Sequence, residues 1–222
     1  MLKKFTASPE LLHVLDRLMQ MPCLNDFRLV GGTALSLLRG HRRSDDIDLF
    51  TYKEYASISF NDIEEQLKLE FPVVLNNDDN FPALKSLDNN YGLHLFIGDQ
   101  NTPIKVDLLN WNDDFLFPFQ EMENIRLATI EEIATMKLDV ISRGGRKKDF
   151  WDLSEILETH LLSSLISLYE KKYPYYEVQL VIKGLTDFTI ADDMPDPICF
   201  KGKHWELIQQ EMKQEVQRLS VA

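Results

Sequence analysis

The chain has 222 residues, of which 44% are hydrophobic, and carries a formal net charge of −12 at pH 7 with an isoelectric point near 4.8. Its length allows one large domain or two small ones with a buried core. Its acidity excludes a protein that binds nucleic acid through its overall charge, so any nucleic-acid binding would need a local basic patch. Two distant cysteines, Cys23 and Cys199, argue against a disulfide framework and a structural zinc site.

The N-terminus lacks an apolar stretch of signal-peptide length, and no apolar run approaches the roughly 18 residues that a membrane span needs. We therefore expect a soluble cytoplasmic protein that does not associate with membranes.

The first half of the chain alternates between helical and strand patterns. A helix is predicted over 8–21, where Ser8-Pro9-Glu10 is a start signal, and a strand over 27–30 runs into Gly31-Gly32. The further predictions are a helix from Thr33 to Arg39 closed by Gly40, a strand over 47–50, a helix over 61–71, and a β-hairpin formed by 93–97 and 104–109.

Beyond residue 129 the patterns are helical. Thr129 and Glu132 match a capping box, which predicts a helix that runs to about Arg143. Further helices are predicted over 149–170 and 205–219, with a loop around 192–197. The expected fold class is α+β, with an α+β domain over 1–128 and a helical region over 129–222.

The first group of candidate functional residues is the pair Asp46 and Asp48. Alternate residues of a strand share a face, so both carboxylates point the same way while Ile47 and Leu49 point into a core. Two neighbouring carboxylates repel each other unless a cation lies between them. Hard divalent cations such as Mg²⁺ take oxygen ligands and bridge substrate phosphates, so the pair indicates a metal site.

A glycine turn precedes this pair. Gly31-Gly32-Thr33 leads from a strand into a helix, and a helix N-terminus with unpaired N–H groups suits a phosphate. Arg42 and Ser44, with Arg43 between them, would add anion contacts. The alternative is a purely structural turn followed by surface cations, but the combination with Asp46 and Asp48 is less easily accidental.

Lys137 lies in the apolar stripe of the helix predicted after Thr129, four residues from both Ile133 and Ile141. Burying an ammonium group is costly without an anion, and a nucleotide phosphate would be a suitable one. The alternative is a lysine at the edge of the stripe whose ammonium group reaches water.

The second group of candidates follows Gly144-Gly145. The run 146–148, extended by Arg143, is a concentrated basic patch in an acidic chain. Asp149 and Asp152 are three residues apart and share a helix face, although Asp149 has the alternative role of capping its helix.

These segments resemble a known family. The stretches 31–35 and 40–50 resemble the first motif of the AbiEii/AbiGii toxin-like nucleotidyltransferases, members of the DNA polymerase β superfamily. The later motifs of that family resemble Thr129 with Glu132, then Lys137, then Lys148-Asp149-Phe150-x-Asp152-Leu153. The matching segments run in order from about residue 29 to 153, and the tail after 170 is similar only in Met194-Pro195 and Trp205.

The resemblance implies roles for particular residues. In such enzymes the first two carboxylates hold Mg²⁺ and the nucleoside triphosphate, and a third acid from a neighbouring strand binds metal or deprotonates the attacking hydroxyl. The candidate third acid is Asp107. The alternative is that Asp107 simply faces solvent on an edge strand. The implied catalytic residues are Asp46, Asp48, Asp107 and Asp149, the metal ligands are Asp46, Asp48 and Asp107, and the nucleotide-binding residues are Gly31, Gly32, Thr33, Arg42, Ser44, Lys137 and Lys148.

The resulting hypothesis is a nucleotidyltransferase that uses Mg²⁺ or Mn²⁺ and moves a nucleoside monophosphate from a nucleoside triphosphate to an acceptor hydroxyl. By resemblance it would be the toxin-like component of a toxin–antitoxin or phage-defence pair, with tRNA as acceptor and an antitoxin as partner. The acidity of the chain fits a protein or a small molecule as acceptor equally well. The alternative is a catalytically silent protein of the same fold that binds a nucleotide or a partner.

Overall fold

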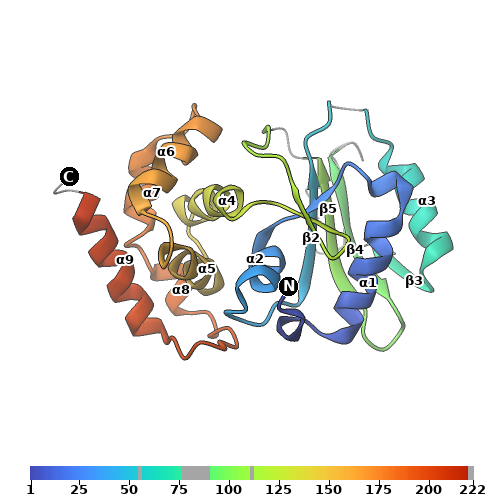
Figure 1. Ribbon diagram of the computed structural model, residues 1–222, viewed down its shortest axis with the longest axis horizontal. Coiled ribbons are helices and arrows are strands. Elements are labelled where there is room, and N and C mark those ends of the chain that lie inside the picture. Colours follow the sequence, from blue (N-terminus) through green and yellow to red (C-terminus); the bar gives the residue numbers. More distant parts are fainter. Residues whose placement is uncertain (55–56, 77–90, 111–112, 220–222) are drawn as a thin grey trace.

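The structure is a computed structural model that describes residues 1–54, 57–76, 91–110 and 113–219. A mixed β-sheet with its helices lies at one end of the molecule, and a group of helices that contains the C-terminus lies at the other (Figure 1). Helix α2 (Gly31–Arg39) lies between the two parts and packs against β2 on one side and against α4 and α5 on the other.

Within the described residues, seven strands form the sheet in the order β3-β4-β5-β2-β1-β7-β6. β2 and β5 run parallel in its middle, and each alternates between buried and partly exposed residues, as period-2 patterning predicts. The predicted hairpin is confirmed as β4 and β5, and sequence patterning missed β3, β6 and β7. The strand bounds are β1 Arg28–Leu29, β2 Asp46–Thr51, β3 Val73–Asn76, β4 Gly92–Gly98, β5 Ile104–Asn110, β6 Gln120–Met122 and β7 Ile125–Leu127.

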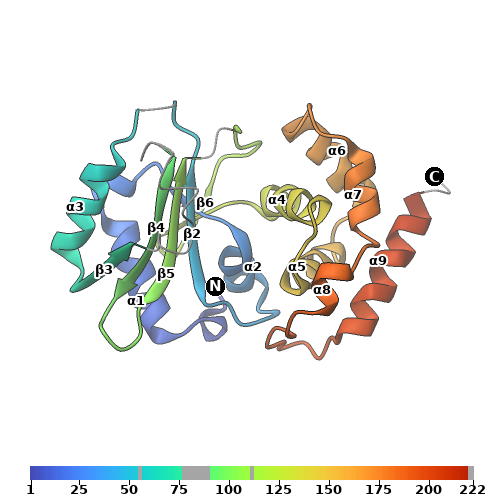
Figure 2. The same cartoon turned by 180° about the vertical axis from the view of Figure 1, so that it is seen from behind.

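Helices α1 (Pro9–Gln20) and α3 (Phe60–Glu70) lie on the face of the sheet away from α2 (Figure 2). Each begins at a serine whose hydroxyl accepts a backbone N–H, Ser8 for α1 and Ser59 for α3. Helix α2 ends at Gly40, whose φ of 71° is the left-handed conformation that glycine adopts at low cost.

The second part of the chain is helical, as predicted, but the helix predicted over 149–170 is wrong. It is divided into α5 and α6, and residues 158–161 interrupt the helix between them. The final helix is confirmed. The helix bounds are α4 Ile130–Ser142, α5 Lys147–Leu157, α6 Leu162–Lys172, α7 Val178–Gly184, α8 Thr189–Asp192 and α9 Trp205–Leu219.

The start of α4 shows how its cap also joins the two parts. Thr129 accepts a hydrogen bond from the backbone N–H of Glu132, as expected. In a capping box the Glu132 carboxylate would accept the backbone N–H of Thr129. Here the buried carboxylate instead accepts from the N–H groups of Leu116 and Phe117 and pairs with Lys172 at 2.8 Å. One carboxylate therefore fastens the segment after β5 to α4 and α6.

The C-terminal segment also returns to the sheet part of the chain. Phe200 donates its N–H to the carbonyl of His41 at 2.8 Å, and Arg43 donates its N–H to the carbonyl of Ile198 at 2.9 Å. The division into domains at residues 128 and 129 remains a prediction. Within the described ranges, no helix is both long and apolar enough to cross a membrane.

Candidate active site

The predicted carboxylates lie side by side on β2 and β5. Asp48 is the register partner of Asp107 on the adjacent parallel strand, and Asp46 is two residues earlier on the same face of β2. The strand of Asp107 thus pairs directly with that of Asp46 and Asp48, and it lies between β4 and β2 rather than at an edge of the sheet. The inward neighbours Ile47 and Leu49 are fully buried, so the core fixes which way the acids point.

The electrostatics of this cluster are those of negative charge held close together. Burial and the adjacent charges of Asp107 and Asp46 raise the pKa of Asp48 to about 6. Burial also acts to raise the pKa of Asp107, but hydrogen bonds from His94 and Lys105 outweigh it, so the pKa of Asp107 lies below its ordinary value. Asp107 is therefore an anion at neutral pH, and Asp48 is the group that resists ionisation.

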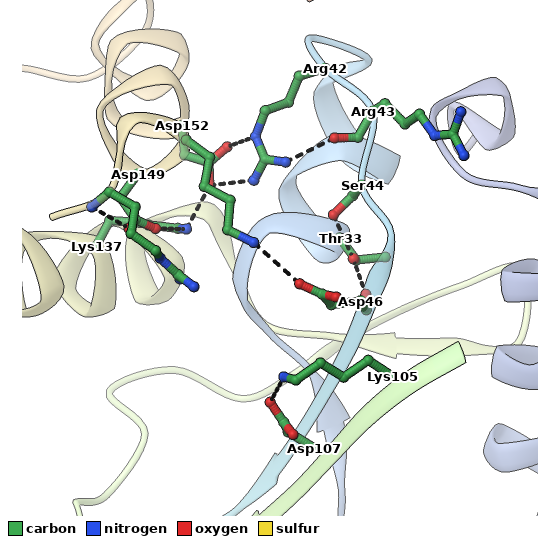
Figure 3. A network of polar contacts seen from close by, with 12 residues as sticks. Thr33, Arg42, Arg43, Ser44, Asp46, Lys105, Asp107, Lys137, Asp149 and Asp152 are labelled. Atoms are coloured by element: carbon green, nitrogen blue, oxygen red, sulfur yellow. Dashed lines mark hydrogen bonds and ion pairs between the residues drawn. The ribbon is translucent and has the colours of Figure 1, made fainter. Parts of the chain in front are cut away.

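Two lysines supply positive charge to the outer acids. The ammonium group of Lys148, at the start of α5, lies 3.2 Å from Asp46. The ammonium group of Lys105 contacts Asp107 (Figure 3). In this conformation, no three His, Cys, Asp or Glu side chains of the described residues converge as a metal site. The three acids are the oxygen donors that could hold a divalent cation, because they share one face and their charge is only partly compensated.

The two glycines before α2 are required for different reasons. Gly31 has a φ of 67°, and a Cβ there would lie 2.7 Å from Oδ2 of Asp48. A Cβ on Gly32 would collide with the guanidinium of Arg42. Because Val30, at the N-cap, makes no side-chain cap, the first turn of α2 presents N–H groups directly beside the acids.

Asp152 is the centre of a buried ion-pair network (Figure 3). The guanidinium of Arg42 donates to both of its oxygens, at 2.6 and 2.8 Å, and His41 contacts it at 2.8 Å. Burial acts to raise the pKa of Asp152, but the charges of Arg42 and Lys137 hold it well below its ordinary range. This network connects the loop after α2 to α5.

Lys137 is buried in the apolar stripe, and its anions are two aspartates. Its ammonium group lies 2.7 Å from Asp149 and 2.6 Å from Asp152. Burial acts to lower the pKa of Lys137, but these two carboxylates raise it above its ordinary value, so the lysine stays charged. Asp149 also accepts the N–H of Arg146 at 3.0 Å, so it both caps α5 and pairs with Lys137.

Thr33 and Ser44 hold the loop before β2 against α2. Their hydroxyls are 2.8 Å apart, and that of Thr33 also donates to the carbonyl of Asp46 (Figure 3). Both side chains are buried. The pair fixes the position at which β2 begins, and with it the direction of the first carboxylate.

A cavity of about 200 Å³ lies between the sheet and α4. It brings together every residue to which the sequence assigned a catalytic, metal-binding or nucleotide-binding role except Thr33, and the further candidate Asp152 is also absent from its lining. The assigned residues in its lining are Asp46, Asp48, Asp107, Asp149, Gly31, Gly32, Arg42, Ser44, Lys137 and Lys148.

Other residues of the site were missed. His94 lies 2.8 Å from Asp107 because the two residues are register partners across the hairpin of β4 and β5. The sequence does not indicate that register. Lys105 lies two residues before Asp107 on the same strand face, and that spacing could have indicated the pair. Asp152 is a candidate from the sequence, but its contact with His41 spans 111 residues, and no local pattern indicates that contact.

Known proteins resemble this chain over most of its length. A protein of Aquifex aeolicus, aq_aa25, is 29% identical over 209 residues, which cover 92% of this chain and 93% of the relative. Among solved structures, MenT4, a nucleotidyltransferase toxin of Mycobacterium tuberculosis, matches 92% of this chain and 82% of its own, with a TM-score of 0.56 and 15% identity. JHP933 of Helicobacter pylori matches 94% of this chain and 88% of its own, with a TM-score of 0.52 and 17% identity.

The two structures share the fold at low sequence identity. The model of one protein family, described as the nucleotidyl transferase AbiEii toxin of type IV toxin–antitoxin systems, matches residues 13–220, which include all the acids of the site. The chain therefore belongs to the AbiEii family of nucleotidyltransferase toxins.

Proposed function

We propose that this nucleotidyltransferase moves a nucleoside monophosphate from a nucleoside triphosphate to an acceptor hydroxyl, with loss of pyrophosphate, and that an RNA such as tRNA is the acceptor. The observation that carries the proposal is the shared face of Asp46, Asp48 and Asp107 beside the first turn of α2. Oxygen ligands for cations and N–H donors for phosphate then lie in one cavity.

The three acids fit divalent cations. Burial and the negative charges of Asp107 and Asp46 raise the pKa of Asp48, and lysine ammonium groups contact the carboxylates of Asp46 and Asp107. Asp46, Asp48 and Asp107 would hold Mg²⁺ or Mn²⁺. When bound, such ions neutralise triphosphate charge and orient the reacting phosphate.

The remaining site residues divide into groups that bind and groups that position. The N–H groups of Gly31 and Gly32, the hydroxyl of Ser44 and the ammonium groups of Lys137 and Lys148 would contact the triphosphate. The Nε and Nη2 groups of Arg42 both donate to Asp152. The hydroxyl of Thr33 is hydrogen-bonded to Ser44 and to the carbonyl of Asp46. Arg42 and Thr33 therefore act by positioning the loop that leads into Asp46.

Asp107 is the better placed of the two candidate bases. Its low pKa keeps it ionised, and it lies next to Asp48 at the cavity wall. Asp149 is fully buried, and its two oxygens are already bonded to Lys137 and to Arg146. Asp107 would accept or orient the proton of the attacking hydroxyl, and Asp149 would hold Lys137 in place.

The path for the acceptor follows a neighbouring groove of about 470 Å³ that shares Asp46, Arg146 and Lys148 with the active-site cavity. The groove includes most of the basic run that the sequence singled out. An RNA backbone fits this local positive charge, whereas the net charge of −12 opposes RNA binding elsewhere on the chain.

The decisive experiment incubates the protein with each labelled nucleoside triphosphate, Mg²⁺ and either total RNA or a protein extract. Wild type is compared with Asp48→Ala and with Asp26→Ala, a matched control because Asp26 is exposed, pairs with Lys53 and lines neither the cavity nor the neighbouring groove. The proposal expects label on RNA with wild type and Asp26→Ala but not with Asp48→Ala. Absence of transfer to both acceptors would refute it, and label on protein alone would refute the RNA acceptor.

The toxin role has a cellular test. Expression of wild type should arrest growth, and Asp48→Ala at equal protein level should not. If the chain has an antitoxin, co-expression of a reading frame adjacent to its gene should restore growth without removing the protein. Arrest that persists in Asp48→Ala would contradict a toxin that acts through nucleotidyl transfer.

A further inference from the structure

The active-site cavity has two chemically different ends. One end holds the acids, the glycine turn and Lys137, all of which suit phosphates and cations. The other end is formed by Phe50 on β2, Met136 and Val140 on α4, and Tyr173 after α6. This second end offers an aromatic and apolar wall, which suits a planar ring better than a phosphate.

The hydroxyl of Tyr173 is unusual within this wall. The side chain is 2% exposed, and within the described ranges its hydroxyl makes no hydrogen bond. Burial, and then the charges of Asp139, Asp113 and Glu132, raise the pKa of Tyr173 above its ordinary value, so the hydroxyl remains protonated. A buried donor without an acceptor is costly, which makes a ligand atom a natural partner.

Asp139 provides a carboxylate at the same end. It is 5% exposed, lines the cavity, and lies on the same face of α4 as Met136 and Val140. One of its oxygens contacts Arg143, and among the described residues the other accepts no hydrogen bond. The carboxylate therefore offers an acceptor close to the Tyr173 hydroxyl, which offers a donor.

We propose that this end of the cavity is the nucleobase subsite, in which the Tyr173 hydroxyl and the Asp139 carboxylate read the hydrogen-bonding edge of the base. The inference rests on the proposed nucleotidyl transfer and adds to it the origin of nucleotide selectivity. The contacts at the phosphate end are the same for all four nucleoside triphosphates. A donor beside an acceptor at the other end rejects bases whose edge presents the opposite order.

The test measures binding of ATP, CTP, GTP, UTP and inorganic tripolyphosphate to the purified protein by calorimetry in the presence of Mg²⁺. The variants are Tyr173→Phe and Asp139→Asn. The control is Tyr169→Phe, which removes a hydroxyl four residues earlier that bonds to Ser142 and does not line the cavity. Thermal unfolding of each variant is recorded without nucleotide.

The expected result has three parts. Wild type prefers one base, Tyr173→Phe and Asp139→Asn weaken binding of that nucleotide by roughly tenfold or more, and tripolyphosphate binding stays unchanged. Tyr173→Phe also unfolds at no lower temperature than wild type, since the hydroxyl has no partner to lose. Tyr169→Phe keeps the wild-type preference, although it loses a hydrogen bond.

Different failures have different meanings. If wild type transfers label to its acceptor but both variants keep its base preference, or if wild type binds all four nucleotides equally, the subsite assignment is wrong and the proposed function stands. If binding of tripolyphosphate falls as much as binding of the nucleotide, the subsite assignment is also wrong. If wild type neither binds a nucleotide nor transfers label, the proposed function fails and the inference fails with it.

Discussion

Asp48 and Asp107 are register partners on the parallel strands β2 and β5, and the pKa of Asp48 is raised to about 6 by burial and by the adjacent charge. A carboxyl group whose folded pKa is raised binds more protons in the folded than in the unfolded state. Its contribution to stability is therefore lost as the pH rises from about 4 through 6. Without a cation, the ionised carboxylate of Asp48 therefore opposes folding at neutral pH.

Asp48→Asn should accordingly stabilise the metal-free protein at pH 7.5, by about 1–3 kcal/mol. At pH 4, where the native carboxyl is already protonated, the gain should largely vanish. Urea unfolding in the presence of a chelator at both pH values measures the difference, with Asp45→Asn as a control of equal charge change. An Asp48→Asn variant that is no more stable than wild type at pH 7.5 would show that the cluster is not strained.

Replacement of Asp152 should destabilise the protein, whereas replacement of Asp48 should stabilise it. Asp152→Ala leaves Arg42 buried without its carboxylate and Lys137 with one of two, and should lower the free energy of unfolding by roughly 3–5 kcal/mol. Because the pKa of Asp152 is lowered, this stability is present above about pH 4 and is lost as the pH falls through the lower folded value. In chemical denaturation, Arg42→Met combined with Asp152→Leu should lose less than the sum of the single variants, and simple additivity would argue against the pair.

Gly31→Ala tests the close approach of Asp48. A Cβ at this position meets both an unfavourable φ of 67° and Oδ2 of Asp48, whereas Gly202 has a φ of 71° and open space around it. Gly202→Ala should therefore cost only backbone strain, on the order of 1 kcal/mol. Gly31→Ala should cost as much and should also abolish nucleotidyl transfer, measured by labelled product. Equal activity of the two variants would remove Gly31 from the site.

Lys148→Met and Lys105→Met should both strengthen metal binding, and Lys148→Met should weaken phosphate binding. Each variant frees a carboxylate that an ammonium group now holds, so the nucleotide-free protein should bind Mn²⁺ more tightly, measured by titration. Lys148→Met should at the same time weaken binding of tripolyphosphate. The exposed Lys171→Met, after which neither affinity should change, controls for loss of charge. Unchanged Mn²⁺ affinity in Lys148→Met and Lys105→Met would mean that these lysines do not compete with a cation.

Much of the fold could be predicted because local chemistry determines it. The serine cap of α1, the left-handed glycine after α2 and the apolar stripe of α4 are all legible in the sequence. The single helix predicted over 149–170 was wrong because the apolar spacing continues through Thr159, His160 and Leu161 without glycine or proline. Strands β6 and β7 were missed because three residues give no usable period.

The site was predictable to the extent that its residues lie on short, regular segments. The shared face of Asp46 and Asp48 follows from strand period, but the approach of Asp107 depends on a parallel register that no local pattern encodes. For Lys137, the sequence indicated a buried cation in need of an anion. The anions observed are Asp149 and Asp152, from the next helix, and the contribution of a nucleotide phosphate remains a proposal.

The central claim, that the acids shared by β2 and β5 carry out nucleotidyl transfer, is tested most directly by pyrophosphate release. Wild type, Asp48→Asn, Asp107→Asn and the control Asp26→Asn, at an exposed residue outside the cavity and the neighbouring groove, are each given nucleoside triphosphate, Mg²⁺ and the acceptor. The account predicts one pyrophosphate for each label transferred by wild type and Asp26→Asn, and rates at least roughly a hundredfold lower for the other two. Release by Asp48→Asn and Asp107→Asn at the rate of Asp26→Asn would contradict it.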